Sequence, residues 1–268
     1  LVRGSAMSLY DWRIFGTKTF VGFDNFIEAL TQPLFWKSLQ NTLYYAALSL
    51  TFGFATPIFL ALLLSEVPRF KITYRILFYL PALTSGLVIM FLWKDLFFDA
   101  SPGGLLNRII GSLGLPPQTW LQDPRLAMAC IILPGVWAGA GPGSIIYLAA
   151  LRTVPEEIYE AAEMDGASTF QKITQITLAY LKPLILINFI GAFIGTFQAT
   201  QNIIVMTMGG PENATHTLSL EIWSNAFLYL KFGYATAMAW IMGSMLIGFT
   251  LYQLRIFQRV QFTASGSA

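Results

Sequence analysis

The chain has 268 residues, of which 55% are hydrophobic and only 11% carry a charge. Soluble domains carry roughly 25% charged residues, so this composition excludes a protein whose entire surface faces water and indicates an integral membrane protein. One cysteine and one histidine exclude an intrachain disulfide and leave too few soft ligands for a zinc site, and a net charge of +2 without a basic stripe argues against a nucleic-acid partner.

Residues 1–40 form an N-terminal segment that we predict to lie where the membrane meets water. The sequence over 8–43 is rich in aromatic and polar residues and contains no continuous apolar span. Aromatic side chains gather where a bilayer meets water, so the segment is typical of an interfacial position. The aromatic residues concerned include Trp12, Phe20, Phe23 and Trp36.

Five apolar stretches follow, each close to the roughly 20 residues that a helix needs to cross a bilayer. None contains Asp, Glu, Lys or His, and Arg255 stands at the edge of the last one. Proton-driven carriers usually mark their route with such residues, so we expect this chain to take its energy from elsewhere. We therefore predict an all-α integral membrane protein, a polytopic helical bundle. The predicted spans, within a membrane domain at 41–257 followed by a C-terminal tail at 258–268, are 41–64, 76–93, 126–151, 184–206 and 235–256.

Two loops between the spans carry turn signals. The loop at 94–125 contains Pro102-Gly103-Gly104 and Pro116-Pro117, which favour turns on both sides of a short helix predicted over 105–113. The loop at 208–231 begins with Gly209-Gly210-Pro211.

The third span has glycines and a proline near its centre. Gly139, Gly141, Pro142 and Gly143 follow Trp137 closely. Such residues weaken a helix, so we expect the backbone to distort here and to expose carbonyl groups.

Residues 153–183 are the one long, charged and helix-patterned segment between two apolar spans. Thr153 and Glu156 have the spacing of a capping box, and acidic residues follow near the positive end of the helix dipole. Gly166 can adopt the left-handed conformation that ends a helix.

A second capping box is predicted directly after this glycine, at Ser168 and Gln171. We therefore expect two short helices joined at a glycine elbow, after which Pro183 leads into the next span.

The elbow carries a recognisable signature. It contains Glu160-Ala161-Ala162, then Asp165-Gly166-Ala167, then Ile176-Thr177-Leu178 and Pro183. These runs resemble the EAA signature of bacterial ABC importer permeases, in the carbohydrate subgroup of the maltose and glycerol-phosphate type. Ile173 and Ala179 depart from the usual pattern, which has an aromatic residue and a proline there. Both positions lie after the elbow, so the departures concern the path into the next span and not the docking surface.

The resemblance implies the fold of a type I ABC importer permease. In that family a further helix precedes the five spans visible here, and residues 1–7 would then be its tail. The segment after that helix lies along the periplasmic face in the family, which implies the same position for residues 1–40. The elbow is the family's coupling helix, a knob that seats in a cleft of a separate ATPase subunit. The residues to which this coupling role is carried are Glu160, Ala161, Ala162, Asp165, Gly166 and Ala167.

The resemblance also implies partners. Two permeases pair, here most simply as a heterodimer, two ABC ATPase subunits dock on the elbows, and a periplasmic or lipid-anchored solute-binding protein delivers substrate. This chain has no G-x-x-x-x-G-K-[ST] loop, so we expect no cofactor on it and place ATP and Mg on the ATPase subunits. The implied location is the bacterial cytoplasmic (inner) membrane, in contact with membrane lipid.

The fourth span is unusually polar after its middle. Uncharged amides and hydroxyls beside an aromatic ring suit a sugar, and they also suit hydrogen bonds to neighbouring helices. In the family, the middles of the third and fourth spans line the translocation cavity. The pathway residues implied on this basis are Trp137, Gly139, Phe193, Thr196, Phe197, Gln198, Thr200, Gln201 and Asn202.

A cytoplasmic elbow sets the orientation of the loops. It places Arg69, Lys71, Arg75 and Arg259 inside, in agreement with the positive-inside rule. The support is partial, because other cations would then lie outside: Arg3, Arg13, Lys18, Lys37, Lys94, Arg108 and Arg125.

Together these observations predict a permease subunit of an ATP-driven importer that moves a carbohydrate by alternating access. The alternative is an ion-gradient-driven secondary transporter or channel, which a sodium site built from backbone carbonyls would allow. An intramembrane enzyme is disfavoured because the spans hold no carboxylate, lysine or histidine to act as acid or base. We therefore expect no catalytic residues and no metal site, and a chain that is part of an ATP-hydrolysing complex without being its ATPase.

Overall fold

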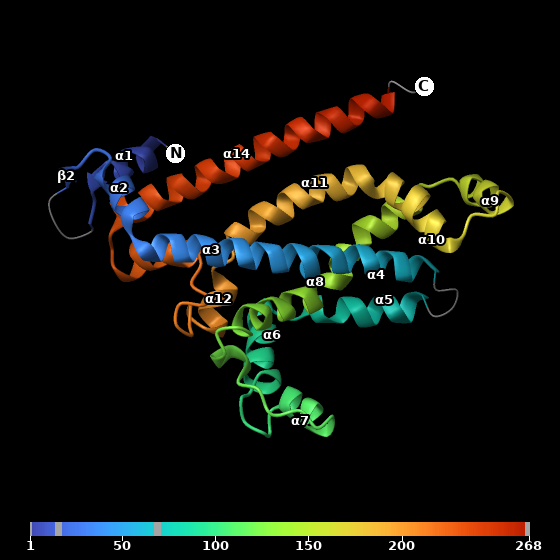
Figure 1. Cartoon of the computed structure of the whole chain (residues 1–268), viewed down its shortest axis with the longest axis horizontal. Coiled ribbons are helices and arrows are strands. Elements are labelled where there is room, and N and C mark those ends of the chain that lie inside the picture. Colours follow the sequence, from blue (N-terminus) through green and yellow to red (C-terminus); the bar gives the residue numbers. More distant parts are fainter. Residues whose placement is uncertain (1, 14–17, 67–70, 266–268) are drawn as a thin grey trace.

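The computed structural model describes residues 2–13, 18–66 and 71–265, which are mostly helical. Long helices lie side by side in one bundle, with the elbow at one end and the N-terminal helices at the other (Figure 1). Over the described ranges, four helices are long and apolar enough to cross a membrane, and a bent helix pair supplies a fifth span. The prediction of a polytopic helical bundle is thus confirmed.

The first span is longer than predicted. It runs unbroken over Pro33–Glu66 as α3 (Pro33–Leu48), the π-helical turn η1 (Ser49–Phe54) and α4 (Ala55–Glu66). The sequence predicted that this span starts at residue 41 and that residues 8–43 contain no span. Both predictions were wrong, because the helix already begins at Pro33, and proline is well tolerated in the first turn, where its missing N–H costs nothing. At about 1.5 Å per residue the helix is about 50 Å long, so its outer turns can carry polar side chains beyond the bilayer.

The second span is broken where the sequence predicted a continuous helix over 76–93. The two halves, Ile72–Leu83 and Gly86–Phe97, meet at an angle of 93°. Pro81 offers no N–H to the preceding turn, and the backbone at Thr84 is extended and Ser85 is not helical. The elements are α5 (Lys71–Tyr79), the 3₁₀ turn η2 (Leu80–Leu83), α6 (Gly86–Leu92) and the π-helical turn η3 (Trp93–Phe97).

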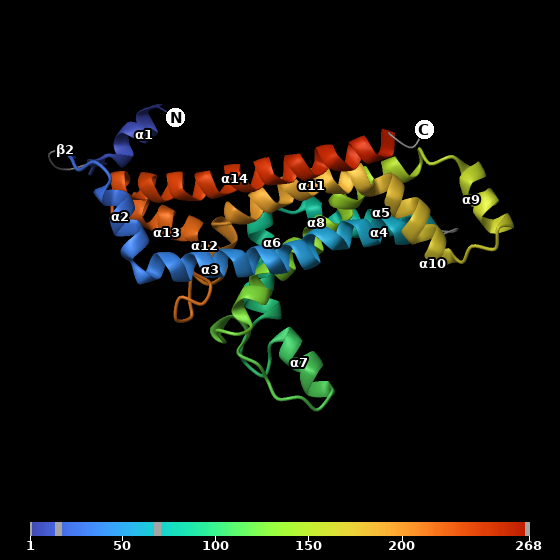
Figure 2. The ribbon, with the colours of Figure 1, turned by 45° about the horizontal axis from the view of Figure 1, so that its top comes forward.

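A small outer subdomain projects from the bundle after η3 (Figures 1 and 2). It contains α7 (Leu105–Ser112), which confirms the predicted short helix, and the 3₁₀ turn η4 (Trp120–Gln122). Asn107 holds it together, because its buried Nδ2 donates to the carbonyls of Asp99, Ser101 and Gln118. The Oδ1 of Asn107 accepts from the Gln118 N–H and from Trp120 Nε1.

We expect replacement of Asn107 by alanine to loosen this subdomain. The change removes five partly buried hydrogen bonds, and a typical hydrogen bond contributes about 0.5–1.5 kcal/mol. The thermal stability of the purified protein should fall, and proteolysis within 94–125 should accelerate. Ser112→Ala is the matched control, because that exposed hydroxyl only donates to Ile109 O. Equal proteolysis rates in the two variants would contradict this role of Asn107.

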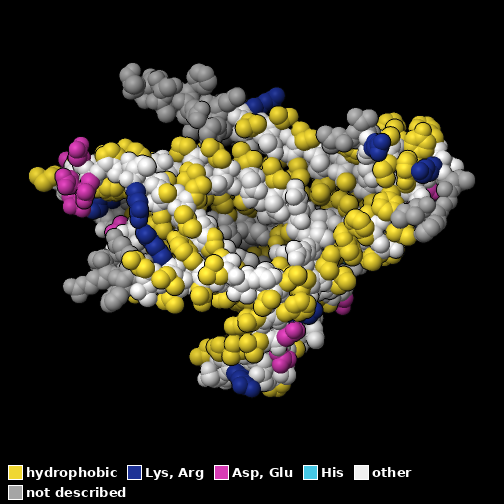
Figure 3. Space-filling view, turned by 180° about the vertical axis from the view of Figure 1, so that it is seen from behind, with side chains coloured by type: hydrophobic (Ala, Val, Ile, Leu, Met, Phe, Trp, Pro, Cys, Tyr) yellow, Lys and Arg dark blue, Asp and Glu magenta, His cyan; other side chains and the backbone are white. Residues whose placement is uncertain are grey.

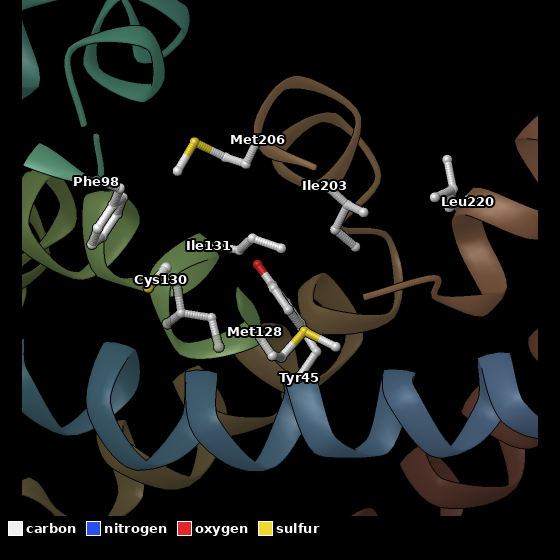
Figure 4. Packing of buried hydrophobic residues seen from close by; sticks show 9 residues of the cluster. Tyr45, Phe98, Met128, Cys130, Ile131, Ile203, Met206 and Leu220 are labelled. Carbon is white, nitrogen blue, oxygen red and sulfur yellow. The ribbon is translucent and has the colours of Figure 1, made fainter. Parts of the chain in front are cut away.

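The third span is α8 (Ala127–Leu151), the central helix of the bundle. It remains one continuous helix across Pro134 and Pro142, so the distortion expected near 139–143 does not break it. At its outer end a buried apolar cluster joins α8 to α3, α12 and α13, and Tyr45 points from α3 toward Ile131 of α8 (Figure 4).

The predicted fourth span at 184–206 was also displaced. The helix runs over Thr169–Phe197 as α10 (Thr169–Gln171), the π-helical turn η5 (Lys172–Thr177) and α11 (Leu178–Phe197), and Pro183 lies inside it. The helical hydrogen bonds stop after Phe197, and residues 198–200 link to a separate helix, α12 (Gln201–Met206). The second elbow helix is therefore the first turn of this span.

The last span, α14, covers Phe232–Ser265 and continues through most of the predicted tail. The N-terminal segment packs against its outer end, where Asn25 Nδ2 donates to Ser8 O and Tyr10 O. Arg69 lies outside the described residues, as do the side chains of Lys71 and Arg259. The remaining elements are α1 (Val2–Ser8), β1 (Tyr10–Asp11) paired antiparallel with β2 (Thr19–Phe20), α2 (Asp24–Thr31), α13 (Leu218–Trp223) and the π-helical turn η6 (Ser224–Leu228).

The surface of the bundle matches a protein that faces lipid. Apolar side chains cover its middle, and acidic side chains gather at the elbow end, on the left of Figure 3. Charge at the ends and apolar cover between them is the pattern that a bilayer imposes.

Candidate functional site

A pocket of about 390 Å³ opens between three spans: the first, the third and the fourth. This volume lies within the range of small-molecule sites, roughly 300–1,000 Å³. No charged side chain is among its lining residues, which are Tyr45, Ser49, Leu50, Gly53, Phe54, Pro57, Gly143, Ile146, Tyr147, Asn188, Ala192, Gly195 and Thr196.

The polar groups of the pocket come from all three spans. Ser49 lies within hydrogen-bonding reach of the Tyr45 hydroxyl on the first span, and that hydroxyl accepts from Asn202 Nδ2 at 3.3 Å. The Tyr147 hydroxyl of α8 lies beside the Asn188 side chain of α11. The buried Nδ2 of Asn188 has no hydrogen-bond partner in the described part of the chain. The pocket thus places an amide beside aromatic rings and hydroxyls.

A π-helical turn shapes one wall. Four of the lining residues, from Ser49 to Phe54, belong to η1. A π-helical turn inserts extra backbone into a helix and changes the direction of the side chains that follow, and such turns are frequent at functional sites. The turn explains how consecutive residues of one helix, Ser49 and Leu50, both reach the pocket.

The structure brings only part of the predicted pathway set to this pocket. Thr196 lines it, and Asn202 approaches it through Tyr45. The other predicted residues do not line it. Phe193 stacks on Phe249 of α14 with ring centroids 3.6 Å apart and contacts buried Phe197, and Trp137 packs on Trp93. Gly139 of α8 and Gln201 of α12 are not among the lining residues, and neither are Gln198 and Thr200 of the link between α11 and α12.

Sequence reasoning missed Tyr45, Ser49, Tyr147 and Asn188. A signal for the last was present, since Asn188 is the one amide in the apolar run 184–197. Tyr45 and Ser49 are four residues apart and so share a helix face. What the sequence did not reveal is which helix faces meet.

The elbow lies at the opposite end of α11 from Thr196. Its helix α9 (Glu156–Met164) has no buried residue. Pro155 is the N-cap, and Thr153 donates to Ala150 O at 2.8 Å, so the predicted capping box of Thr153 and Glu156 was wrong. The extended backbone of Pro155 starts the helix at Glu156, which leaves Thr153 too far upstream to cap it.

The end of α9 is built as predicted. Gly166 has φ +77°, its N–H donates to Glu163 O, and the Ala167 N–H donates to Ala162 O. These two bonds form a Schellman motif, which satisfies the last carbonyls of the helix. The second capping box, of Ser168 and Gln171, is present.

The predicted coupling residues form one exposed surface around this bend. Glu160, Ala161, Asp165 and Gly166 are exposed, and Ala162 and Ala167 are half-buried. Small side chains flanked by two carboxylates suit close approach of a partner with basic groups.

The sequence of this chain is similar to a family of transport proteins and to several of its members. Residues 49–261 match the family described as "Binding-protein-dependent transport system inner membrane component". A probable ABC transporter permease protein of Pyrococcus horikoshii is 35% identical over 239 residues, which cover 88% of this chain and 81% of that relative. The lactose transport system permease protein LacF of Rhizobium radiobacter is 32% identical over 247 residues, 90% of this chain and 82% of the relative.

A solved structure is similar over nearly the same extent. A chain of a bacterial alginate ABC transporter, crystallised in complex with an alginate pentasaccharide-bound periplasmic protein, matches with a TM-score of 0.82 at 27% identity. The match covers 89% of this chain and 83% of that chain.

Proposed function

Because the chain belongs to the family of binding-protein-dependent transport system inner membrane components, we propose that its pocket is the path along which an ATP-driven importer passes a carbohydrate. The family and the type I importer fold predicted from the sequence are confirmed. The protein is accordingly a multi-pass component of the inner membrane.

The pocket supports the carbohydrate part of this proposal. Carbohydrates present hydroxyls that pair with amides and hydroxyls, and C–H faces that stack on aromatic rings. Tyr45, Tyr147 and Asn188 supply both kinds of group, and no lining residue carries a charge. The single observation that carries the proposal is this uncharged lining, in which three spans bring two tyrosine rings and an amide to one pocket.

Relatives support the same class of cargo. The name of the Rhizobium relative specifies lactose, and the similar crystal structure contains a transporter with an alginate pentasaccharide on its periplasmic protein. A neutral lining argues for an uncharged sugar or oligosaccharide in this chain.

The partners proposed are those that the elbow and the outer loops require. A second permease completes the path as a heterodimer, and two ATPase subunits that bind ATP and Mg dock on the exposed surface around Gly166. A solute-binding protein delivers the carbohydrate at the other end of the bundle. Glu160 and Asp165 supply the charges that the docked ATPase meets.

Reconstituted uptake tests the proposal. The chain, its second permease, the ATPase and the binding protein are placed in liposomes, and entry of labelled oligosaccharides is followed with and without ATP. We expect entry to need ATP and to resist an ionophore. Entry without the ATPase, abolished by the ionophore, would instead identify a secondary transporter.

The same uptake assay also tests whether the pocket lies on the transport path, by means of a variant at Asn188. Asn188→Leu removes the amide from the pocket wall at nearly constant volume, so ATP-dependent uptake at low substrate concentration should fall roughly 5- to 100-fold, the equivalent of about 1–3 kcal/mol. Gln198→Leu is the matched control, because that amide is exposed and lies off the pocket. Equal uptake by Asn188→Leu and the unaltered protein would remove the pocket from the pathway.

A further inference from the structure

The helix α9 is only loosely attached to the rest of the molecule. None of its residues is buried. A pocket of about 310 Å³ separates it from the ends of α4 and α8 and from η5. A helix that does not pack closely on its neighbours passes a displacement to them through its two chain connections and through the few side chains that reach across.

Two side chains of α9 reach across to η5. The Tyr159 hydroxyl lies 3.0 Å from Thr177 Oγ1, and the Glu163 carboxylate pairs with Lys172 Nζ. The side chain of Glu163 is 63% exposed, and exposed ion pairs contribute little. Thr177 is only 6% exposed, so its contact with Tyr159 is the stronger link.

The direction of the hydrogen bond follows from the other partner of Thr177. The Thr177 hydroxyl donates to Lys172 O at 3.2 Å, within the π-helical turn. Its single hydrogen is used there, so Tyr159 donates its O–H to Thr177 Oγ1. Tyr159 therefore acts on a π-helical turn, a place where helical hydrogen bonding is already altered.

This turn leads without a break into α11, whose far half lines the substrate pocket. Asn188 lies eleven residues after Thr177, about 16 Å along the axis at about 1.5 Å per residue. A shift of α9 that pulls on Thr177 thus moves a helix that carries Asn188 and Thr196 at the pocket wall.

We propose that Tyr159 and Thr177 are positioning residues that transmit motion of the docking helix α9 to α11 and so to the pocket. The inference rests on the proposed function and deepens it. It assigns the transmission to one hydroxyl–hydroxyl contact, beside the surface that the ATPase covers.

The test uses the complete reconstituted complex and measures carbohydrate taken up per ATP hydrolysed. Tyr159→Phe removes the donor and Thr177→Val removes the acceptor at nearly constant volume. Each should lower uptake per ATP roughly three- to tenfold while the basal ATP hydrolysis and the assembly of the complex stay unchanged. The double variant should be no worse than Thr177→Val, because that change already removes the bond that Tyr159→Phe removes.

Two further variants separate transmission from simple damage. Thr177→Ser keeps the hydroxyl, so its uptake per ATP should stay within about twofold of the unaltered complex. Glu163→Gln removes only an exposed ion pair, so its uptake per ATP should also stay within about twofold. Additive losses in the double variant, or a Thr177→Ser variant as poor as Thr177→Val, would overturn the inference. So would wild-type coupling in Tyr159→Phe.

The proposed function and this inference fail in different ways. An unaltered complex that shows no ATP-dependent uptake rejects both. An unaltered complex that couples normally, together with Tyr159→Phe and Thr177→Val variants that couple equally well, rejects the inference alone.

Discussion

Replacement of Gly141 by alanine should destabilise the helical bundle severely. A Cβ at this position would lie 2.1 Å from the carbonyl oxygen of Phe78 and 2.6 Å from the ring of Tyr79. The obstacle is the backbone of α5, which cannot rotate away as a flexible side chain can. The α5 and α8 helices would have to separate, and overpacking typically costs about 1–3 kcal/mol, with the upper end expected where the obstacle is backbone. Thermal unfolding of the purified protein and the amount of folded protein in the membrane would report the loss.

Gly139 supplies the matched control on the same helix. A Cβ there meets nothing within 4 Å. Alanine is also a better helix former than glycine, by about 0.5–1 kcal/mol, so Gly139→Ala should be neutral or mildly stabilising. Equal stability of the Gly141→Ala and Gly139→Ala variants would show that α5 and α8 do not approach each other as closely as described. Normal uptake by Gly139→Ala would also argue against the pathway role predicted for Gly139 from the sequence.

Replacement of Gly166 by proline should abolish coupled uptake while leaving the protein in the membrane. Proline fixes φ near −65°, whereas Gly166 has φ +77°, and proline removes the N–H that donates to Glu163 O. The penalty of about 3 kcal/mol or more falls on the end of an exposed helix with no buried residue, so it changes the elbow and not the bundle. It corresponds to roughly a hundredfold loss of the native bend. Uptake in reconstituted liposomes and the membrane abundance of the variant are the two measurements.

Gly166→Asn is the control for this prediction. Asparagine tolerates the left-handed region and keeps the backbone N–H, and a side chain here meets nothing within 4 Å. Uptake by Gly166→Asn should therefore stay within about threefold of the unaltered protein, since most of the helix ending is retained. Substantial uptake by Gly166→Pro would count against a docking role for the bend.

The candidate site divides between what is local in sequence and what is not. The bend at Gly166 and the capping box at Ser168 follow from the chemistry of a few neighbouring residues, and both were predictable. The pocket depends on three helices that are far apart in the chain, and of its lining residues only Thr196 belonged to the predicted pathway set. A run of apolar residues shows that a helix is buried in lipid or protein, but it does not show which face meets which neighbour.

The sequence by itself determined the class of structure, the number of spans and the elbow, because apolar length and helix-ending residues act locally. Only the tertiary structure decided where the helices begin, bend and touch: the 93° break after Leu83, the end of α11 at Phe197 and the close approach at Gly141. The physical reason is that a bilayer stabilises any sufficiently apolar helix, whatever its neighbours. The ends, breaks and contacts of the helices depend instead on the shapes of helices that meet only in the folded molecule.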